Sequence, residues 1–225
     1  GAFQSVWNVK ARTLCRVPAS VPLPQAALIE PIAVACHDVR IGRVRKGETV
    51  VVLGGGPIGM LIAMVARAEG AKVLISEISP FRIEAARAAE FEVVNPQEQD
   101  LVAAVNERTG GAGADVVFEV TASAAAAQVM TDLVRTRGRI VVVGIYSQKP
   151  PVDLFRFFWR EIELLGARLY ESEDFEQAVA LAASGVLPLG SLITGVYELE
   201  NIQTAFESME NNQQAMKTLV RCSAE

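Results

Sequence analysis

Residues 51–59 decide the fold, and they read VVLGGGPIG. An apolar run enters a cluster of glycines, in which Gly54, Gly56 and Gly59 have the spacing G-x-G-x-x-G. In a strand–turn–helix unit the first glycine permits the tight turn, the second lets a pyrophosphate approach the backbone, and the third lets the helix pack against the strand. The helix that follows would point its positive end at the phosphates. The stretch therefore predicts a dinucleotide site of the Rossmann type.

The acidic residue that such a site requires is Glu77, 21 positions after Gly56 and at the end of a second apolar run. A carboxylate there accepts hydrogen bonds from the adenosine ribose hydroxyls, which predicts NAD as the cofactor. The alternative is a structural glycine turn in another α/β fold. It is disfavoured because strand, helix and carboxylate occur in the required order. A second glycine cluster, at 110–113, precedes a strand and is interpreted as a turn.

Strand and helix signals alternate on both sides of this motif. The strand-like runs are continuously apolar, as expected when helices cover both faces of a sheet. Such alternation predicts α/β architecture with a doubly wound parallel sheet. We expect strands at 50–53, 72–75, 93–94, 116–120 and 140–143. We expect one helix that follows the glycine motif and ends near residue 70, and further helices at 81–90, 100–109 and 122–135.

The two ends of the chain differ from this middle part. Residues 1–35 contain four prolines and no helix–strand rhythm. Residues 187–225 suggest a strand at 192–197, a helix at 201–209 and a strand at 218–220. Because neither end could bury a core alone, we interpret them as two pieces of a second domain that flanks the Rossmann unit.

The composition excludes several classes of function. The chain has 225 residues, of which half are apolar, and a net charge of -5, so neither disorder nor nucleic-acid binding is expected. The uncharged stretches 49–66 and 177–197 are broken by glycines and a proline, which argues against a membrane helix. Three widely spaced cysteines indicate a reducing compartment, the cytoplasm, and offer no zinc framework.

Several segments together resemble the medium-chain dehydrogenase/reductase superfamily, and more closely its zinc-dependent polyol and threonine dehydrogenase branch. Besides residues 47–59 and the Glu77 segment, these are 27–34 (ALIEPIAV), 79–82 (SPFR), 94–96 (VNP), 138–146 and 173–176 (EDFE). The resemblance implies a Rossmann domain at 36–186. It also implies that 1–35 and 187–225 belong to an incomplete GroES-like catalytic domain.

The resemblance also implies which residues bind the cofactor. The nicotinamide would lie beside Val143-Gly144-Ile145, and Arg82 would lie over the adenine end, although a solvent-facing arginine is an equal alternative. The full set of expected cofactor residues is Gly54, Gly56, Pro57, Ile58, Gly59, Glu77, Arg82, Thr121, Val143, Gly144 and Ile145.

The departures from the family pattern concern the metal and the substrate. The family's cysteine ligand, its His-Glu pair and its four-cysteine zinc lobe do not occur here, so zinc is expected only in a longer parent protein. Glu30 matches a position near the family's zinc, yet one carboxylate cannot hold the metal, and a capping or salt-bridging role is favoured. The family often has a histidine at Thr194 or Gly195, and Phe91 replaces a usual Gly-Ala-Asp.

Other candidate catalytic residues are weak. His37 is the only histidine and is interpreted as a packed or surface side chain. Tyr146 and Lys149 have the spacing Tyr-x-x-Lys, which does not make them neighbours one helical turn apart, so a short-chain dehydrogenase pair is rejected. The catalytic residues therefore stay unassigned.

Two classes of function remain. The first is the NAD-binding part of a zinc-dependent alcohol or polyol dehydrogenase, which transfers a hydride between a secondary alcohol and NAD. The second is a dinucleotide-binding module without catalysis of its own. We expect the 225-residue chain by itself to show no turnover and to hold no stoichiometric zinc. We also expect a homodimer or homotetramer formed through an apolar outer strand at 161–168.

Overall fold

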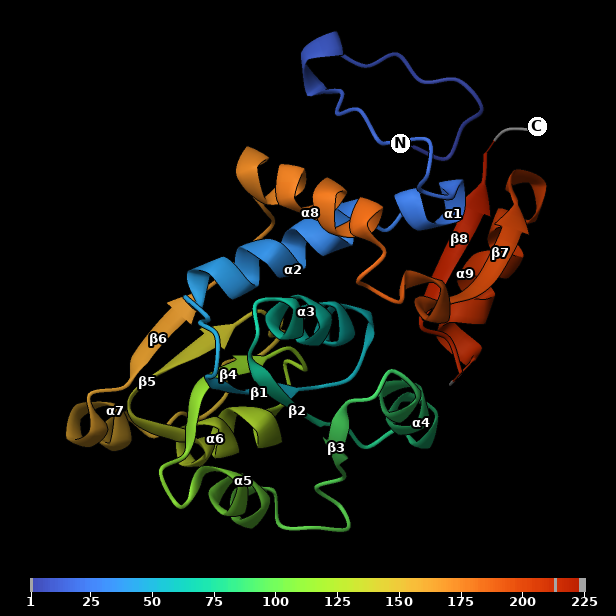
Figure 1. Cartoon of the computed structure of the whole chain (residues 1–225). Coiled ribbons are helices and arrows are strands. Elements are labelled where there is room, and N and C mark those ends of the chain that lie inside the picture. Colours follow the sequence, from blue (N-terminus) through green and yellow to red (C-terminus); the bar gives the residue numbers. More distant parts are fainter. Residues whose placement is uncertain (1, 213, 223–225) are drawn as a thin grey trace.

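The computed structural model describes residues 2–212 and 214–222 and alternates strands and helices along most of its length (Figure 1). The central strands are β1 (Thr49–Leu53), β2 (Lys72–Ser76), β3 (Glu92–Val94), β4 (Ala114–Glu119), β5 (Val134–Val142) and β6 (Glu163–Gly166). The helices between them are α3 (Pro57–Ala68), α4 (Pro80–Ala88), α5 (Leu101–Thr109), α6 (Ala124–Leu133) and α7 (Leu154–Arg160). Two further long helices, α2 (Ile29–Ile41) and α8 (Ser172–Ser184), pack against each other.

The six strands pair in parallel in the order β3-β2-β1-β4-β5-β6. This is the strand order of a doubly wound dinucleotide-binding sheet, so the predicted fold class is confirmed. The order reverses between β1 and β4, and ligands of such sheets bind at the carboxyl ends of the strands at this reversal. The glycine motif follows β1 and therefore lies at that point.

Helices cover both faces of the sheet, as the apolar runs indicated. In Figure 1, α2, α3 and α8 lie above the sheet, and α5 and α6 lie below it. Along β1, Val50 and Val52 join the upper core, while Val51 and Leu53 join the lower one. Because alternate residues of a strand point to opposite faces, a strand covered on both sides is apolar throughout.

Helix α6 ends and strand β5 begins earlier than predicted. The alanine-rich composition favoured a helix over 122–135, but α6 ends at Leu133 and β5 already starts at Val134. Val134 is fully buried and pairs with Ala114, so its packing in the sheet outweighs the local helix propensity. The backbone then bulges through Arg137, which has a φ of +58°.

The predicted boundary between residues 35 and 36 falls inside α2. The first half of this helix contributes Ile29 and Ile32 to the same core as Val50, so α2 as a whole packs on the central sheet unit. At the other end of the chain, β7 (Ile193–Glu198) and β8 (Lys217–Arg221) form a separate parallel pair, connected by α9 (Ile202–Asn211). These elements confirm the strand, helix and strand predicted there.

The remaining elements are short. Among the described residues before α2, the chain forms only α1 (Leu23–Ala26) and the 3₁₀ turn η1 (Ala11–Thr13). The 3₁₀ turns η2 (Leu189–Leu192) and η3 (Leu199–Asn201) flank β7. Among the described residues, none of the helices has the length and apolarity needed to cross a membrane.

Candidate functional site

The glycine motif forms a tight turn that side chains could not occupy. Gly54 has a φ of +107° and donates its N–H to the Ser76 carbonyl at 2.8 Å. A Cβ on Gly59 would lie 1.9 Å from the Gly54 carbonyl oxygen, so α3 approaches β1 more closely than any side chain allows. Gly56 is the N-cap of α3 in an extended conformation, and Pro57 follows at the first helical position. The turn thus presents the unpaired N–H groups of the α3 N-terminus, a ready site for an anion.

Glu77 closes this turn from the end of β2. Its side chain is buried, and Oε2 accepts the Gly55 N–H at 2.7 Å. Oε1 accepts the N–H groups of Ile78 and Ser79 at 2.7 and 2.9 Å. Three backbone donors therefore orient the carboxylate before any ligand arrives.

Arg82 of α4 lies across the second glycine. Its Nη1 would lie 3.5 Å from a Cβ on Gly56 and is 3.9 Å from the Glu77 carboxylate. Its Nε is buried without a hydrogen-bond partner among the described residues. The guanidinium therefore lies beside Gly56 and Glu77 and retains an unused donor.

The carboxyl ends of β4 and β5 supply the other predicted residues. Thr121 follows β4, and its methyl carbon would lie 2.8 Å from a Cβ on Gly54, so it adjoins the glycine turn directly. Val143 and Gly144 donate their N–H groups to the Glu119 carbonyl, both at 2.9 Å. Ile145 is 94% exposed, which leaves an apolar side chain free at this edge. The glycine turn therefore contacts both Glu77, through the Gly55 N–H, and Thr121, beside Gly54. Glu119 accepts hydrogen bonds from Thr121 and from Gly144 and so connects the turns after β4 and β5.

Glu119 is a residue that the sequence analysis missed. It ends β4, is completely buried, and hydrogen-bonds to Thr121 and Ala122 through its side chain. A charged residue inside the otherwise apolar run 116–120 is the signal that could have identified it.

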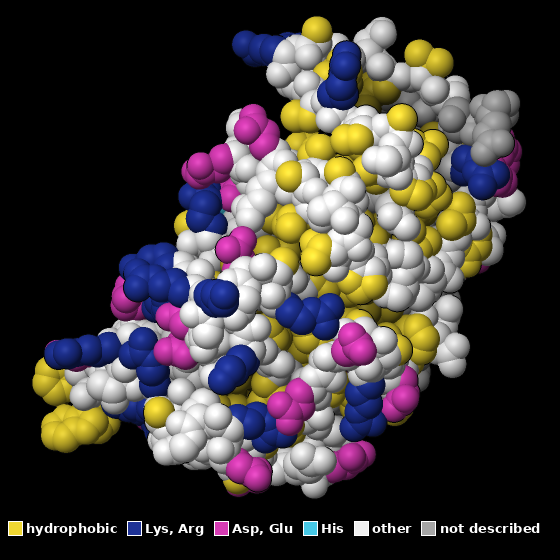
Figure 2. All heavy atoms as spheres, in the orientation of Figure 1, with side chains coloured by type: hydrophobic (Ala, Val, Ile, Leu, Met, Phe, Trp, Pro, Cys, Tyr) yellow, Lys and Arg dark blue, Asp and Glu magenta, His cyan; other side chains and the backbone are white. Residues whose placement is uncertain are grey.

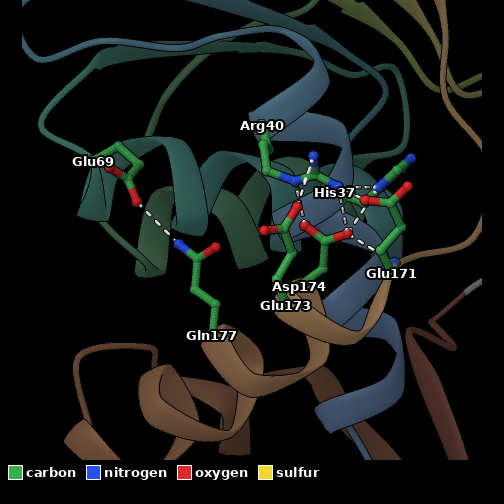
Figure 3. A network of polar contacts seen from close by, with 7 residues as sticks. All are labelled: His37, Arg40, Glu69, Glu171, Glu173, Asp174 and Gln177. Carbon is green, nitrogen blue, oxygen red and sulfur yellow. Dashed lines mark hydrogen bonds and ion pairs between the residues drawn. The ribbon is translucent and has the colours of Figure 1, made fainter.

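A second polar cluster joins α2 to α8 and is shown in Figure 3. The buried Asp174 accepts hydrogen bonds from His37 Nδ1 and Arg40 Nε, each at 2.8 Å. Arg40 also contacts Glu171 at 2.7 Å and Glu173 at 3.0 Å. We call the five residues His37, Arg40, Glu171, Glu173 and Asp174 the α2–α8 clamp. Burial alone would raise the pKa of Asp174, but the Arg40, Glu171 backbone and His37 hydrogen bonds lower it to about 2.

The α2–α8 clamp explains the single histidine. The predicted packed or surface histidine is in fact 9% exposed and paired, so it holds two helices together. His37, Glu171 and Asp174 are also the one described group whose ligand atoms lie close enough to hold a metal ion. Arg40 already bonds both carboxylates, and a guanidinium at that place opposes cation binding.

The residues at the carboxyl edge do not fit a catalytic zinc. The described part of the chain offers no cluster of three metal-ligating side chains there, and three protein ligands are the usual requirement. Glu30 is exposed in the first turn of α2, where its negative charge stabilises the helix by interacting with the positive end of the helix dipole. It has no ion-pair partner among the described residues. Thr194, at a position where the family often has a histidine, accepts the Met216 N–H at 2.8 Å and so connects β7 to the start of β8.

Two further sequence features have structural explanations. Phe91 is buried, and the Arg67 guanidinium lies 4.0 Å from its ring centroid, so this replacement of the usual Gly-Ala-Asp fills the core beside α3. Tyr146 and Lys149 lie in a segment without regular secondary structure, in agreement with the rejection of a helical Tyr/Lys pair.

Comparison with known proteins identifies the family. The model of a family described as zinc-binding dehydrogenase matches residues 57–184, more than half of the chain. A 2-dehydro-3-deoxy-L-galactonate 5-dehydrogenase from Pseudoalteromonas atlantica is 54% identical over 225 residues, which are 100% of this chain and 66% of that relative. A sorbitol dehydrogenase from Halalkalibacterium halodurans is 32% identical over 98% of this chain and 65% of its own length.

A solved structure agrees. The 2R,3R-butanediol dehydrogenase from Bacillus subtilis superposes with a TM-score of 0.87 at 30% identity, covering 92% of this chain and 60% of that one. The chain thus spans 60–66% of the length of these three proteins. The resemblance inferred from the motifs is confirmed, and the chain belongs to the zinc-binding dehydrogenase family.

Proposed function

We propose that the carboxyl edge of the sheet, at the reversal between β1 and β4, binds a nicotinamide dinucleotide and that NAD is preferred. The glycine turn carries this proposal, because Gly59 permits a helix approach that would place a Cβ 1.9 Å from a carbonyl oxygen. The pyrophosphate would bind at the α3 N-terminus, beside Gly54, Gly56, Pro57, Ile58 and Gly59. The adenosine ribose would bind at Glu77, and the nicotinamide at Thr121 and Val143-Gly144-Ile145.

Glu77 is the basis for the preference for NAD. Its carboxylate can accept charge-assisted hydrogen bonds from the ribose diol, worth about 1.5–3 kcal/mol. The extra phosphate of NADP would instead repel the same carboxylate, although solvent and salt weaken that repulsion. We expect a preference of about 2–3 kcal/mol, or roughly 30- to 150-fold. Arg82 opposes it, since a guanidinium 3.9 Å from Glu77 could pair with the phosphate.

The test is a titration of NADH and NADPH followed by calorimetry, on the wild type and on Glu77→Gln. Glutamine has the same shape without the charge, and its amide oxygen can still accept the Ile78 and Ser79 N–H groups, whereas its NH2 group cannot accept the Gly55 N–H. The ratio of the two affinities is therefore the readout, because the lost Gly55 contact weakens both cofactors. We expect the preference for NADH to shrink by about tenfold. Equal wild-type affinities for the two cofactors, or an unchanged ratio in Glu77→Gln, would contradict the assignment.

For the whole protein we infer a hydride transfer between a secondary alcohol and the dinucleotide. The support is family membership and the relatives, which are named for sugar-acid, polyol and diol dehydrogenation. The nicotinamide ring, when bound, accepts the hydride at C4, and this chain contributes the residues that orient it. The 54% identical relative favours a hydroxyl of a sugar acid as the substrate group. A binding module without catalysis remains the alternative, and reduction of NAD by the full-length protein with a panel of sugar acids and polyols distinguishes the two.

We further infer that the whole protein is cytoplasmic and that its domains divide nearly as the resemblance implies, with the residues before α2 and residues 187–225 in the flanking catalytic domain and α2 itself on the Rossmann unit. The three described cysteines, Cys15, Cys36 and Cys222, are unpaired, which suits a reducing compartment. The separate β7–α9–β8 unit supports a second domain at the C-terminal end.

A second copy of the chain is the partner we infer for the outer strand β6. The strand lies at the edge of the sheet, and Leu164 is half exposed. Next to it, α7 exposes Phe155, Phe158 and Trp159, and Figure 2 shows hydrophobic side chains protruding at this end of the molecule. A bare edge flanked by aromatic side chains favours antiparallel pairing across a two-fold axis. Light scattering should give at least a dimer that Leu164→Lys dissociates, and a monomeric wild type would contradict this.

A further inference from the structure

Glu119 lies where the second half of a dinucleotide would be bound, and the function proposed above assigns it no role. The strand order places the adenosine ribose at β2 and the pyrophosphate at the turn after β1, so the nicotinamide half extends over the ends of β4 and β5. Glu119 is the last residue of β4 and is completely buried. Its backbone carbonyl accepts the N–H groups of Val143 and Gly144, which ties the end of β4 to the end of β5.

The side chain of Glu119 determines the shape of the turn after β4. Oε1 accepts the Thr121 N–H at 2.8 Å, the Thr121 hydroxyl at 2.6 Å and the Ala122 N–H at 3.1 Å. Ala122 has a φ of +54°, a left-handed conformation that costs a non-glycine residue energy unless its surroundings enforce it. The carboxylate supplies that constraint, and the turn it holds contacts the glycine turn through the Thr121 methyl group.

The second oxygen faces the turn after β5. A Cβ on Gly144 would lie 2.6 Å from Glu119 Oε2 and 2.6 Å from the Ala122 nitrogen, so the Gly144 backbone packs directly on the carboxylate. The buried Tyr146 hydroxyl lies beside the same group without completing a hydrogen bond of normal geometry. Burial and the neighbouring Glu119 raise the pKa of Tyr146, so the phenol stays protonated as a donor. One carboxylate thus contacts every segment of the predicted nicotinamide subsite.

We propose that Glu119 is a positioning residue for the nicotinamide half of the cofactor, acting through Thr121, Ala122 and Gly144. The proposal rests on the dinucleotide-binding function proposed above. It differs from a general stabilising role in one respect: Glu119 contacts the β4 and β5 turns, whereas in the proposed function the adenosine and pyrophosphate groups would be bound by Glu77 and the α3 N-terminus. Loss of Glu119 should therefore weaken ligands that carry nicotinamide and spare those that lack it.

The experiment compares NADH with ADP-ribose, which shares the adenosine and pyrophosphate groups but has no nicotinamide. Affinities are measured by calorimetry on the wild-type chain and on Glu119→Gln, which keeps the side-chain shape. We expect NADH to bind about tenfold more weakly to the variant, because a neutral amide oxygen holds the Thr121 and Ala122 donors less strongly than a carboxylate does, and we expect ADP-ribose to bind within about twofold of the wild type. Equal losses for both ligands, or no loss for either, would overturn the proposal.

Two further variants keep the outcome interpretable. If Glu119→Gln does not fold, Thr121→Val is the substitute, because it keeps the carboxylate and the methyl group beside Gly54 and removes the hydroxyl that donates to Glu119 Oε1 at 2.6 Å. We expect a smaller loss, about threefold, for NADH alone, and an unchanged NADH/ADP-ribose ratio overturns the proposal. Asp174→Asn, in the α2–α8 clamp, is the control and should lower stability without changing the ratio. A wild-type chain that binds neither ligand would refute the proposed function itself, and this inference with it.

Discussion

The α2–α8 clamp and the carboxyl edge of the sheet are both built around buried carboxylates, but the partners of those carboxylates differ. Asp174 is bonded mainly by the side chains His37 and Arg40, which join two helices and fill the space between them. Glu77 and Glu119 accept hydrogen bonds mainly from backbone N–H groups of turns. The side chain of Ile145, at the same edge of the sheet, stays exposed to solvent. Side-chain ion pairs close a surface and stabilise the fold, whereas backbone donors shape a surface that stays open to a ligand. This contrast supports the proposal that the carboxyl edge, rather than the α2–α8 clamp, binds the cofactor.

The largest effect we expect concerns Asp38, next to the α2–α8 clamp. Both of its carboxyl oxygens are buried without a hydrogen-bond partner in the described part of the chain, and burial, with a contribution from Asp174, raises its pKa to about 7. The unfolded chain releases this proton near pH 4 and the folded chain keeps it to about pH 7. Stability should therefore fall as the pH rises between these values, by at most about 4 kcal/mol.

Urea unfolding at pH 4.5 and pH 8 measures this slope. The wild type should lose stability between the two pH values, and Asp38→Asn should lose much less. Asp174 titrates with the opposite sign, since its pKa of about 2 lies below the unfolded value and its contribution is lost only in stronger acid. Parallel curves for wild type and Asp38→Asn would show that Asp38 ionises normally.

The next largest effect is expected from breaking the α2–α8 clamp. Asp174→Asn leaves His37 and Arg40 without their buried anion, which should destabilise the chain by about 3 kcal/mol. NADH affinity should stay unchanged, because no residue of the α2–α8 clamp lies among those predicted to touch the cofactor. Thermal unfolding and an NADH titration on the same sample separate the two quantities. A parallel loss of cofactor affinity would mean that the two regions are coupled.

At the glycine turn we expect a substitution to lower the affinity for NADH. In Gly59→Ala the new methyl group meets the Gly54 carbonyl, so α3 must move away from β1 and NADH affinity should fall by about 100-fold. Gly190→Ala is the matched control, since its nearest neighbour is 3.8 Å away and the backbone there is not left-handed. If both variants bind NADH like the wild type, the turn does not hold the pyrophosphate.

The smallest effect is a change in thiol reactivity. Burial, with contributions from nearby carboxylates, raises the pKa of Cys36 to about 12, while Cys15 is exposed. An aromatic disulfide reagent should therefore modify Cys15 promptly and Cys36 only when α2 and α8 separate. The Cys36 rate should rise in Asp174→Asn and stay unchanged in Gly190→Ala. Rapid modification of Cys36 in the wild type would argue against a closed α2–α8 interface.

The sequence predicts the adenosine side of the candidate site better than the rest, for a physical reason. The glycine turn and Glu77 depend on local geometry, in which spacing along the chain fixes spacing in the fold. The network of Glu119, Gly144 and Tyr146 depends on the register between β4 and β5, which no short motif encodes. For the same reason the partner of His37, 137 positions away on α8, and the early start of β5 at Val134 could not be predicted.

Hydrogen–deuterium exchange of the wild-type chain with and without saturating NADH tests the contrast between the two regions most directly. The account predicts slower exchange at residues 54–60, 77–82 and 119–123, the turns that line the proposed ligand site. It predicts no change at Ser172–Ser184, the helix that carries Asp174. Protection confined to α8, or unchanged exchange at the glycine turn while NADH is bound, would contradict the assignment of the cofactor to the carboxyl edge.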